Sequence, residues 1–206
     1  MVGERRRRLL GAIAAAPVAL GSAAPLAAFA AADAKPRVRP GDPGWPSDAD
    51  WQRLNAAVGG ALVKVASPFA ACRNDPQSPT CDALFRSPAN PWAIGDDVAL
   101  TQTYGWVDAW TTSPSAYAVV ARNAADVAAA VDFARERRVR LVVKGGGHSY
   151  QGTSNAADSL LVWTRRMNEV RIDDAFVPAS CAGRVAPQRA VHCGAGAVWA
   201  NVYDAV

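Results

Sequence analysis

One run of residues carries the clearest signs of chemistry in this chain. It reads Lys144-Gly145-Gly146-Gly147-His148-Ser149-Tyr150-Gln151-Gly152-Thr153-Ser154. Consecutive glycines after an apolar segment permit positive φ angles and expose successive backbone N–H groups, which together form a nest for an anion. The hydroxyls at 149, 153 and 154 add hydrogen-bond donors, and the Lys144 ammonium can offset negative charge. The run therefore predicts a loop that cradles a pyrophosphate; a tight glycine-rich turn without a ligand is the simpler alternative.

Two phosphate-binding motifs come close to this loop without fitting it. The dinucleotide fingerprint G-x-G-x-x-G needs glycine where Tyr150 stands and a long helix after it, and the next apolar segment follows too soon. The motif G-x-x-x-x-G-K-[ST] matches Gly147 and Gly152, but Thr153 stands where a lysine must reach the phosphates. The loop therefore fits neither class.

A nucleophile elbow, G-x-S-x-G, offers an alternative of another chemical class. Gly147 and Ser149 begin it, but Gln151 replaces the second glycine and no helix is predicted after the serine. An aspartate at 173 or 174 and then His192 follow in the chain order of hydrolases. A serine hydrolase that uses Ser149 is thus the weaker alternative.

The elements around the loop have the pattern of a strand–helix–strand unit. Tyr117–Ala121, Arg140–Val143 and Ser159–Trp163 are short apolar runs typical of buried strands. After the first, Asn123 is suited to cap a helix whose apolar residues recur at helical spacing: Val127, Ala130, Val131 and Ala134. The pattern predicts an α+β fold with a right-handed βαβ crossover, parallel strands and the glycine-rich loop at a strand end.

Two more elements are predicted downstream. Ala190–Cys193 suits a strand. Residues 199–206 suit a helix with four apolar residues on one face: Trp199, Val202, Tyr203 and Val206.

The first thirty-two residues have the pattern of an export signal. Arg5–Arg8 form a basic segment, Leu9–Phe29 carry no charged side chain, and small residues of the A-x-A type follow. Alanine is weakly hydrophobic and prolines interrupt the stretch, so an uncleaved membrane anchor is the weaker alternative. Arg6-Arg7 followed by two leucines loosely fits a twin-arginine signal. We therefore expect export to the periplasm or the exterior, with the twin-arginine route as one option.

Charge gives little support to a nucleic-acid partner. The chain has 22 Lys and Arg against 18 Asp and Glu, a net charge of +4. Arg5–Arg8 less Glu4 supply +3 of this excess (4 − 1), all within the predicted leader. Hydrophobic residues make up 50% of the chain, which excludes a disordered protein. We expect a folded protein with no nucleic-acid partner.

Residues 33–110 are predicted to be a linker and a mostly irregular extension. Prolines and glycines fill 35–50, Trp51–Val58 suits a short helix, Ala61–Val65 is apolar, and 67–91 is loop-like. The sequence indicates no role for this extension.

The four cysteines suggest disulfides rather than a metal site. Cys72 and Cys81 lie close in sequence, as do Cys181 and Cys193, and in an exported chain we expect these local pairs among the three possible pairings. A zinc site at Cys181, His192 and Cys193 is the weaker alternative, since no C-x-x-C occurs and the chain has only 2 histidines. No metal is expected.

The stretch from Tyr117 to Asp173 resembles the N-terminal half of a FAD-binding domain of the vanillyl-alcohol-oxidase (VAO) and p-cresol-methylhydroxylase (PCMH) type. The berberine-bridge-enzyme-like oxidoreductases match best. Their strand ends in [RK]-x-G-G-H-[ST]-x-x-G-x-S, and Lys144–Ser154 fits every specified position. Asp126-Val127 at the start of a helix, Ser159–Leu161 and Met167-Asn168 also fit the family.

This resemblance implies a cofactor and an activity. The cofactor is FAD, with residues 144–154 around its pyrophosphate. His148 holds the position at which many members bind the flavin 8α-methyl covalently; a histidine beside a non-covalent flavin is the alternative. The implied activity is that of an oxidase or dehydrogenase that moves a hydride from a carbon bearing oxygen or nitrogen to flavin N5. His192 is given no role, and we expect it to be structural.

The expected organisation is an export signal at 1–32, the extension at 33–110 and the first half of a PCMH-type domain at 111–206. In the family, the second half of the flavin domain and a substrate domain follow. We therefore expect a fragment or truncated product of an oxidoreductase, with a non-catalytic flavin-binding remnant as the alternative. Half a domain leaves one sheet face uncovered, which predicts low stability. The catalytic base and the substrate are not indicated.

Overall fold

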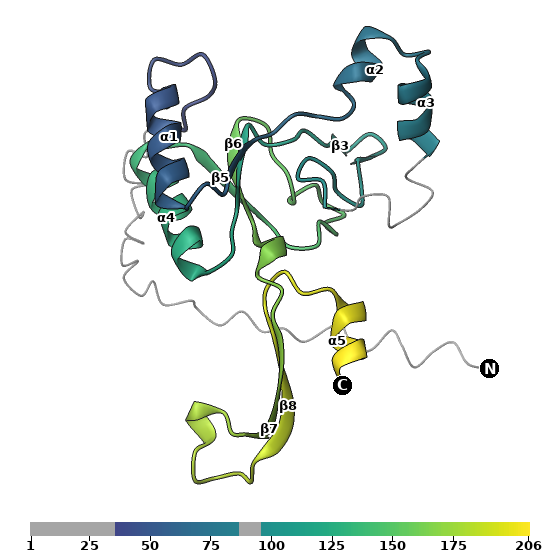
Figure 1. Cartoon of the computed structure of the whole chain (residues 1–206). Coiled ribbons are helices and arrows are strands. Elements are labelled where there is room, and N and C mark those ends of the chain that lie inside the picture. The colour runs from purple at the N-terminus through teal and green to yellow at the C-terminus, as the bar shows by residue number, and fades with distance from the viewer. Residues whose placement is uncertain (1–35, 87–95) are drawn as a thin grey trace, which may run out of the picture. The chain divides into compact units, whose positions relative to one another are not determined.

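A four-stranded sheet organises the protein, whose computed structural model describes residues 36–86 and 96–206 (Figure 1). Its strands, in spatial order, are β1 (Leu62–Lys64), β4 (Tyr117–Val120), β6 (Ser159–Trp163) and β5 (Arg140–Lys144). The last three are parallel, and β1 is antiparallel to β4. The predicted α+β class is confirmed. However, β6 lies between the two strands that the crossover helix connects, so these two do not pair directly.

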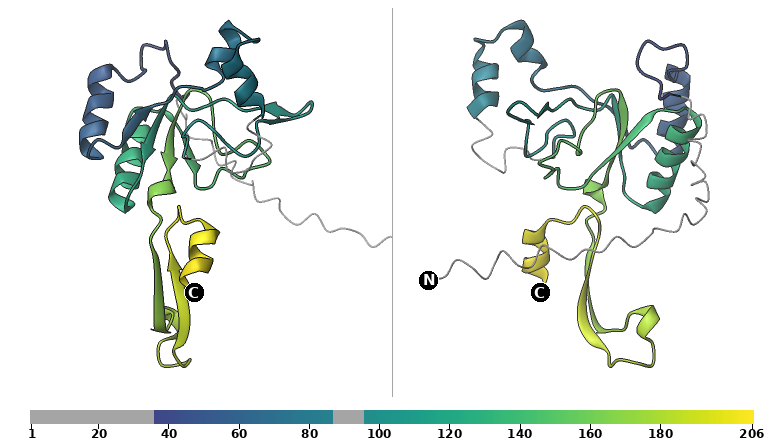
Figure 2. Two further views of the ribbon diagram at one scale, coloured as in Figure 1. Left: turned by 45° about the vertical axis from the view of Figure 1, so that its right-hand side comes forward. Right: turned by 180° about the vertical axis from the view of Figure 1, so that it is seen from behind.

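One face of the sheet is covered by two helices, α1 (Asp48–Ala57) and α4 (Ala124–Glu136), which lie side by side in every view (Figures 1 and 2). The predicted cap of α4 is present, because Asn123 Oδ1 accepts from the N–H of Asp126 at 2.9 Å. The apolar stripe of α4 is narrower than predicted, since Val131 is 41% exposed. A single core joins these helices to the sheet; its buried members include Trp51, Leu54, Val58, Val119, Ala130, Ala134, Leu160 and Val162.

The opposite face of the sheet is also partly packed. All five residues of β6 are buried, because this strand has neighbours on both edges and side chains over both faces. Leu161 and Trp163 pack with Ala118 on this second face, against partly buried Val65 and Val98 from the extension. The expectation of an uncovered face is therefore wrong in part.

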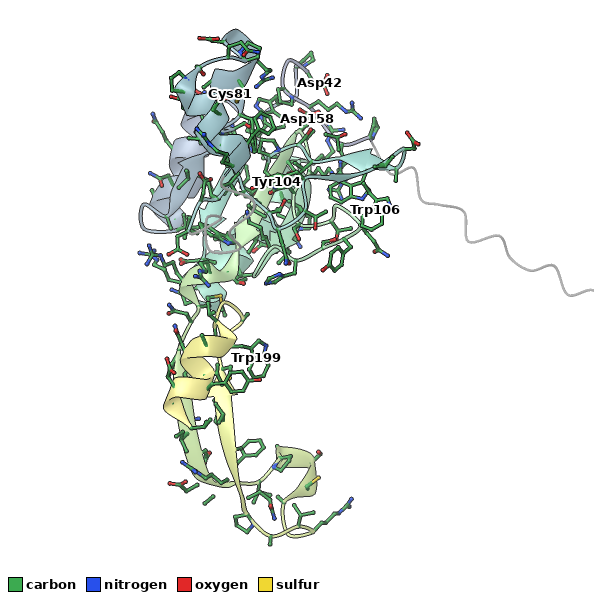
Figure 3. All side chains as sticks on the ribbon, turned by 90° about the vertical axis from the view of Figure 1, so that its right-hand side faces the viewer. Asp42, Cys81, Tyr104, Trp106, Asp158 and Trp199 are labelled. Atoms are coloured by element: carbon green, nitrogen blue, oxygen red, sulfur yellow. A yellow bond between two sulfur atoms is a disulfide. The ribbon has the colours of Figure 1, made fainter. Side chains whose placement is uncertain are left out.

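The extension is more ordered than predicted. It supplies α1, edge strand β1, the short helices α2 (Ala70–Asn74) and α3 (Pro79–Arg86), and a small hairpin of β2 (Gly105–Trp106) and β3 (Trp110–Thr111). A capping box between Ser47 and Asp50 begins α1. The predicted Cys72–Cys81 disulfide is present and ties α2 to α3, with Cys81 buried (Figure 3). The capping box stabilises the start of α1, and the disulfide links the two short helices within residues 67–91, which were predicted to be a loop.

A second hairpin follows the sheet. It consists of β7 (Val170–Phe176) and β8 (Gln188–Cys193), with α5 (Trp199–Ala205) beside it (Figures 1 and 2). The predicted strand at 190–193 is confirmed. The apolar face predicted for α5 is only partly buried, because Val202 is covered while Trp199 and Tyr203 are 68% and 70% exposed (Figure 3).

The predicted Cys181–Cys193 disulfide is absent, and both thiols are free. Cys193 pairs with Val170 at one end of the hairpin, whereas Cys181 lies in a 3-10 turn (Ala179–Cys181) beyond the other end. The six residues of β8 between these ends span roughly 17–20 Å, far more than the ~7 Å that a disulfide tolerates between Cα atoms.

The residues that the structure describes contain no group of histidine, cysteine and acidic side chains able to hold a metal ion. They also contain no helix with the length and apolar character needed to cross a membrane. The predicted leader at 1–32 lies outside the described residues.

Candidate functional site

The glycine-rich loop begins where β5 ends. Lys144, the last residue of β5, is in register with Trp163, the last residue of β6, so the loop leaves the carboxyl edge of the parallel strands. This edge is the usual position of ligands in open sheets with parallel strands. The indole N–H of Trp163 donates to the carbonyl of Gly145 at 3.3 Å and fixes the start of the loop.

The backbone of the loop has the conformation that its glycines predict. Gly147 and Gly152 both have φ of +74°, a region that side chains rarely adopt. Gly147 is buried, and its carbonyl accepts from the backbone N–H of Gln102 at 3.0 Å. Within residues 36–86 and 96–206, the N–H groups of Gly146, Gly147 and His148 donate to no protein acceptor. These three donors are available to an anion.

The hydroxyl groups of the loop are used differently from our prediction. Ser149 Oγ accepts from the backbone N–H groups of Gln151 (3.2 Å) and Thr153 (3.0 Å), and it pairs with the Thr153 hydroxyl at 2.8 Å. Ser154 Oγ accepts from the N–H of Ser149 at 3.4 Å. The hydroxyls therefore brace the second half of the loop against itself.

Lys144 is buried beside the loop and holds a neighbouring segment. Its ammonium donates to the carbonyls of Val98 and, at 3.0 Å, Leu100, and it lies 5.2 Å from the centroid of the Trp163 ring. Burial lowers the pKa of Lys144 to about 8, although nearby Asp97 acts in the opposite direction. The Lys144 ammonium, which we expected to face a pyrophosphate, therefore donates its hydrogen bonds to backbone carbonyls inside the protein.

The segment at 97–102 lies against the loop through further contacts. Asn155 Nδ2 donates to the carbonyl of Ala99 at 2.9 Å, while Asn155 Oδ1 is buried with no partner among the described residues. Thr101 is buried next to Gly147, where a Cβ added to the glycine would lie 3.5 Å from the threonine Cα. This segment could not be identified from the sequence, because no periodicity or motif marks it and its role depends on contacts 44 to 56 residues away along the chain.

The β2–β3 hairpin supports the far side of the loop. The Trp110 indole N–H donates to the carbonyl of Tyr150 at 3.1 Å, and its ring lies over Gly152, where an added Cβ would approach within 2.7 Å. Trp106 pairs with Trp110 in the hairpin and is 62% exposed (Figure 3). Tyr150 is 66% exposed. The loop therefore adjoins exposed aromatic side chains.

His148 is exposed, and its ring has one polar partner among the described residues. Nδ1 contacts Oε1 of Gln102. The opposite edge of the ring lies over Gly146, since a Cβ added there would be 2.8 Å from Nε2. The histidine that the sequence singled out therefore lies beside the free N–H groups.

The other histidine is in a different environment. His192 lies on β8, where Nε2 is 3.4 Å from Asp173 Oδ2, an ion-pair distance without hydrogen-bond geometry, and Phe176 contacts the ring edge-to-face. The N–H of Ala175 is the main cause that lowers the pKa of Asp173, and His192 contributes. Since the described contacts of Ser149 are all within the loop and those of His192 are within the hairpin, the arrangement gives no support to a serine hydrolase.

A cavity of about 490 Å³ lies near the amino end of β4, whereas the loop follows the carboxyl end of β5. The residues around the cavity include Lys64, Tyr117 and the N-terminal turn of α1. Trp51 stacks on Tyr117 there, with ring centroids 4.0 Å apart. None of the predicted site residues lines this cavity.

Comparisons with known proteins show which family of domains the chain resembles. Residues 114–206 match the family model of a FAD binding domain. The chain is 31% identical over 188 residues to a bifunctional decalin synthase of Penicillium decumbens, covering 82% of this chain and 32% of that protein. It is 32% identical over 158 residues to a VAO-type flavoprotein oxidase of Thermothelomyces thermophilus, covering 66% and 26%. In structure it resembles a VAO-type flavoprotein from Myceliophthora thermophila, with a TM-score of 0.65 and 26% identity over 78% of this chain and 32% of that one.

These similarities establish the class of domain. Residues 114–206 carry a FAD-binding domain sequence of the type found in VAO-type FAD-linked oxidoreductases, and FAD is its cofactor. The chain spans about a third of the length of the curated relatives that it matches. The residues of the loop fit the cofactor, because three N–H groups have no acceptor within the described part of the chain, Gly146 is exposed, and His148 is exposed beside it.

Proposed function

We propose that the chain is the flavin-binding part of an exported FAD-linked oxidoreductase. The observation that carries the proposal is the group of three N–H donors that have no acceptor among residues 36–86 and 96–206. They lie next to exposed His148, at the carboxyl end of β5 and within the segment that matches a FAD binding domain. The N–H groups of Gly146, Gly147 and His148 bind the pyrophosphate, and the protein residues behind the loop keep these donors oriented.

His148 is the proposed covalent tether. One of its ring nitrogens would hold the flavin at the 8α carbon; forming that bond would release two protons and two electrons, and dioxygen would take up both to give hydrogen peroxide. The bound cofactor supplies hydride acceptance at N5 from a substrate carbon that bears oxygen or nitrogen. The protein residues contribute orientation of the cofactor and retention of it outside the cell. A small-molecule substrate is proposed for the complete enzyme.

Acid precipitation tests the tether. The full chain, purified after expression with FAD, is expected to be yellow and to keep its flavin in the acid pellet. His148→Ala is expected to release the flavin, while His192→Ala, the matched histidine variant, retains it. Equal retention in the two variants would exclude His148 as the tether, and a colourless chain that does not take up FAD would contradict flavin binding by this chain.

Export is proposed from the basic and apolar pattern of the leader. Expression of the full chain in a bacterial host should yield a periplasmic product whose mass corresponds to cleavage near residue 32. Replacement of Arg6 and Arg7 by lysine should block export if the twin-arginine route operates. An uncleaved product that stays with the cytoplasmic fraction would refute export.

A further inference from the structure

We propose that Gln102 is the positioning residue of His148. Its side-chain carbonyl accepts from Nδ1–H, fixes the tautomer of the imidazole, and leaves the Nε2 lone pair next to the free N–H groups of the loop. The inference rests on the proposed function only in giving His148 a role toward the flavin; the tautomer itself is a property of the chain without cofactor.

Contacts on both sides hold Gln102 in place. Its backbone N–H donates to the carbonyl of Gly147 at 3.0 Å, and it follows buried Thr101, whose hydroxyl donates to the carbonyl of Thr103 at 2.9 Å. Two residues earlier, the carbonyl of Leu100 accepts from Lys144. The Gln102 side chain thus extends from a backbone anchored to the same loop that carries His148, although the two residues are 46 positions apart in sequence.

The contact between the two side chains determines which ring nitrogen carries the proton. A neutral imidazole has one N–H and one lone pair, and a hydrogen bond at one nitrogen selects the tautomer. Gln102 presents its carbonyl oxygen Oε1 to Nδ1. A carbonyl oxygen can only accept, so the tautomer that we propose carries its hydrogen on Nδ1 and keeps the lone pair on Nε2.

The resulting orientation places Nε2 over Gly146. A Cβ on Gly146 would lie 2.6 Å from the ring carbon Cδ2 and 2.8 Å from Nε2, so any side chain at this position would displace the ring. The N–H of Gly146 is one of the free donors. The glycine therefore allows a nucleophilic nitrogen and a part of the anion nest to occupy the same turn.

The test reads the tautomer directly in the full chain without FAD. Long-range 1H–15N correlation at about pH 8.5, where an ordinary imidazole is neutral, distinguishes protonated from bare ring nitrogens. Only 2 histidines are present, so His192→Ala assigns the spectrum. The wild type should show His148 with Nδ1 protonated and Nε2 bare. Gln102→Leu should shift His148 toward Nε2–H, Gln102→Glu should restore the wild-type pattern, and Gln52→Leu, at an exposed position of α1, should change nothing.

A second measurement connects the tautomer to the cofactor. Gln102→Leu should slow the appearance of acid-stable flavin by about tenfold, and Gln102→Glu should recover it, with non-covalent FAD uptake unchanged. A wild-type His148 protonated at Nε2, or a His148 tautomer unaffected by Gln102→Leu, overturns the inference whatever the flavin does. Acid-stable flavin that persists in His148→Ala instead overturns the proposed tether and leaves the tautomer result standing.

Discussion

Replacing Lys144 by methionine should change how the stability of the protein depends on pH. Lys144 is 3% exposed, and burial lowers its pKa from 10.5 to about 8. Its ammonium donates to the carbonyls of Val98 and Leu100. Methionine keeps the length and apolar stem of lysine but removes both the titrating group and the two hydrogen bonds.

The magnitude follows from the two pKa values. Between about pH 8 and pH 10.5 the unfolded chain keeps a proton on Lys144 that the folded chain has lost, so the free energy of unfolding rises with pH across this window. At 1.36 kcal/mol per pKa unit, the rise from about pH 7 to about pH 9.5 amounts to roughly 2 kcal/mol. The two lost hydrogen bonds cost about 1–3 kcal/mol each at either pH. The stability difference between wild type and Lys144→Met should therefore be larger at the higher pH, by about 2 kcal/mol.

Urea unfolding at these two pH values measures the effect. Lys64→Met is the matched control, because Lys64 is an exposed lysine on β1. Burial and Asp97 raise the pKa of Tyr104 (Figure 3). This raised pKa makes the free energy of unfolding fall with pH, but only near and above the ordinary tyrosine value of 10.0, so the chosen pH range avoids it. If the difference in free energy of unfolding between the wild type and Lys144→Met is constant with pH, or shrinks as pH rises, the lowered pKa of a buried Lys144 is refuted.

Three further substitutions, each measured by urea unfolding, test the disulfide, the close backbone approach at Gly196 and the N-cap of α4. The double variant Cys72→Ala/Cys81→Ala removes a disulfide that spans 9 residues, and it should lower the free energy of unfolding by about 2–3 kcal/mol. Thiol titration of the unreduced, unfolded wild type should find two thiols. Four thiols would show that the disulfide is absent. Gly196→Ala places a Cβ 1.9 Å from a backbone oxygen and should lower the free energy of unfolding by about 3 kcal/mol or more. The control Gly183→Ala should lower it by about 1 kcal/mol, because the space there is open and only the positive φ opposes a side chain. Similar losses in the two variants would disprove the close approach at Gly196. Asn123→Ala should remove the cap of α4 and about 1 kcal/mol of stability, and an unchanged midpoint would show that the cap is not formed in solution.

The loop could be predicted because its chemistry is local. Positive φ at Gly147 and Gly152 requires glycine, and a strand followed by free N–H groups needs only adjacent residues. The cap of α4 and the Cys72–Cys81 disulfide are also short-range features, and both are present. The Cys181–Cys193 prediction was wrong because sequence proximity does not reveal an extended hairpin that keeps the two ends apart.

Most of the order within the extension was not predictable in the same way. The short helix predicted at Trp51–Val58 is present as α1. Helix α1 and strand β1 are short, and packing on α4 and β4 stabilises them. The residues at 97–102 have no regular structure, and they are held by side chains that enter from the loop.

Residues close together in the chain were sufficient to predict the glycine-rich loop, the strand–helix–strand unit and the resemblance to VAO-type flavoproteins. The partners of the Lys144 ammonium and of the His148 ring became known only from the folded structure. Lys144 binds carbonyls 44 and 46 residues away, and His148 meets Gln102 across 46 residues. Such contacts form only when the sheet brings distant segments to one edge. For buried Lys144, burial also makes an unpaired charge costly and so favours its carbonyl partners.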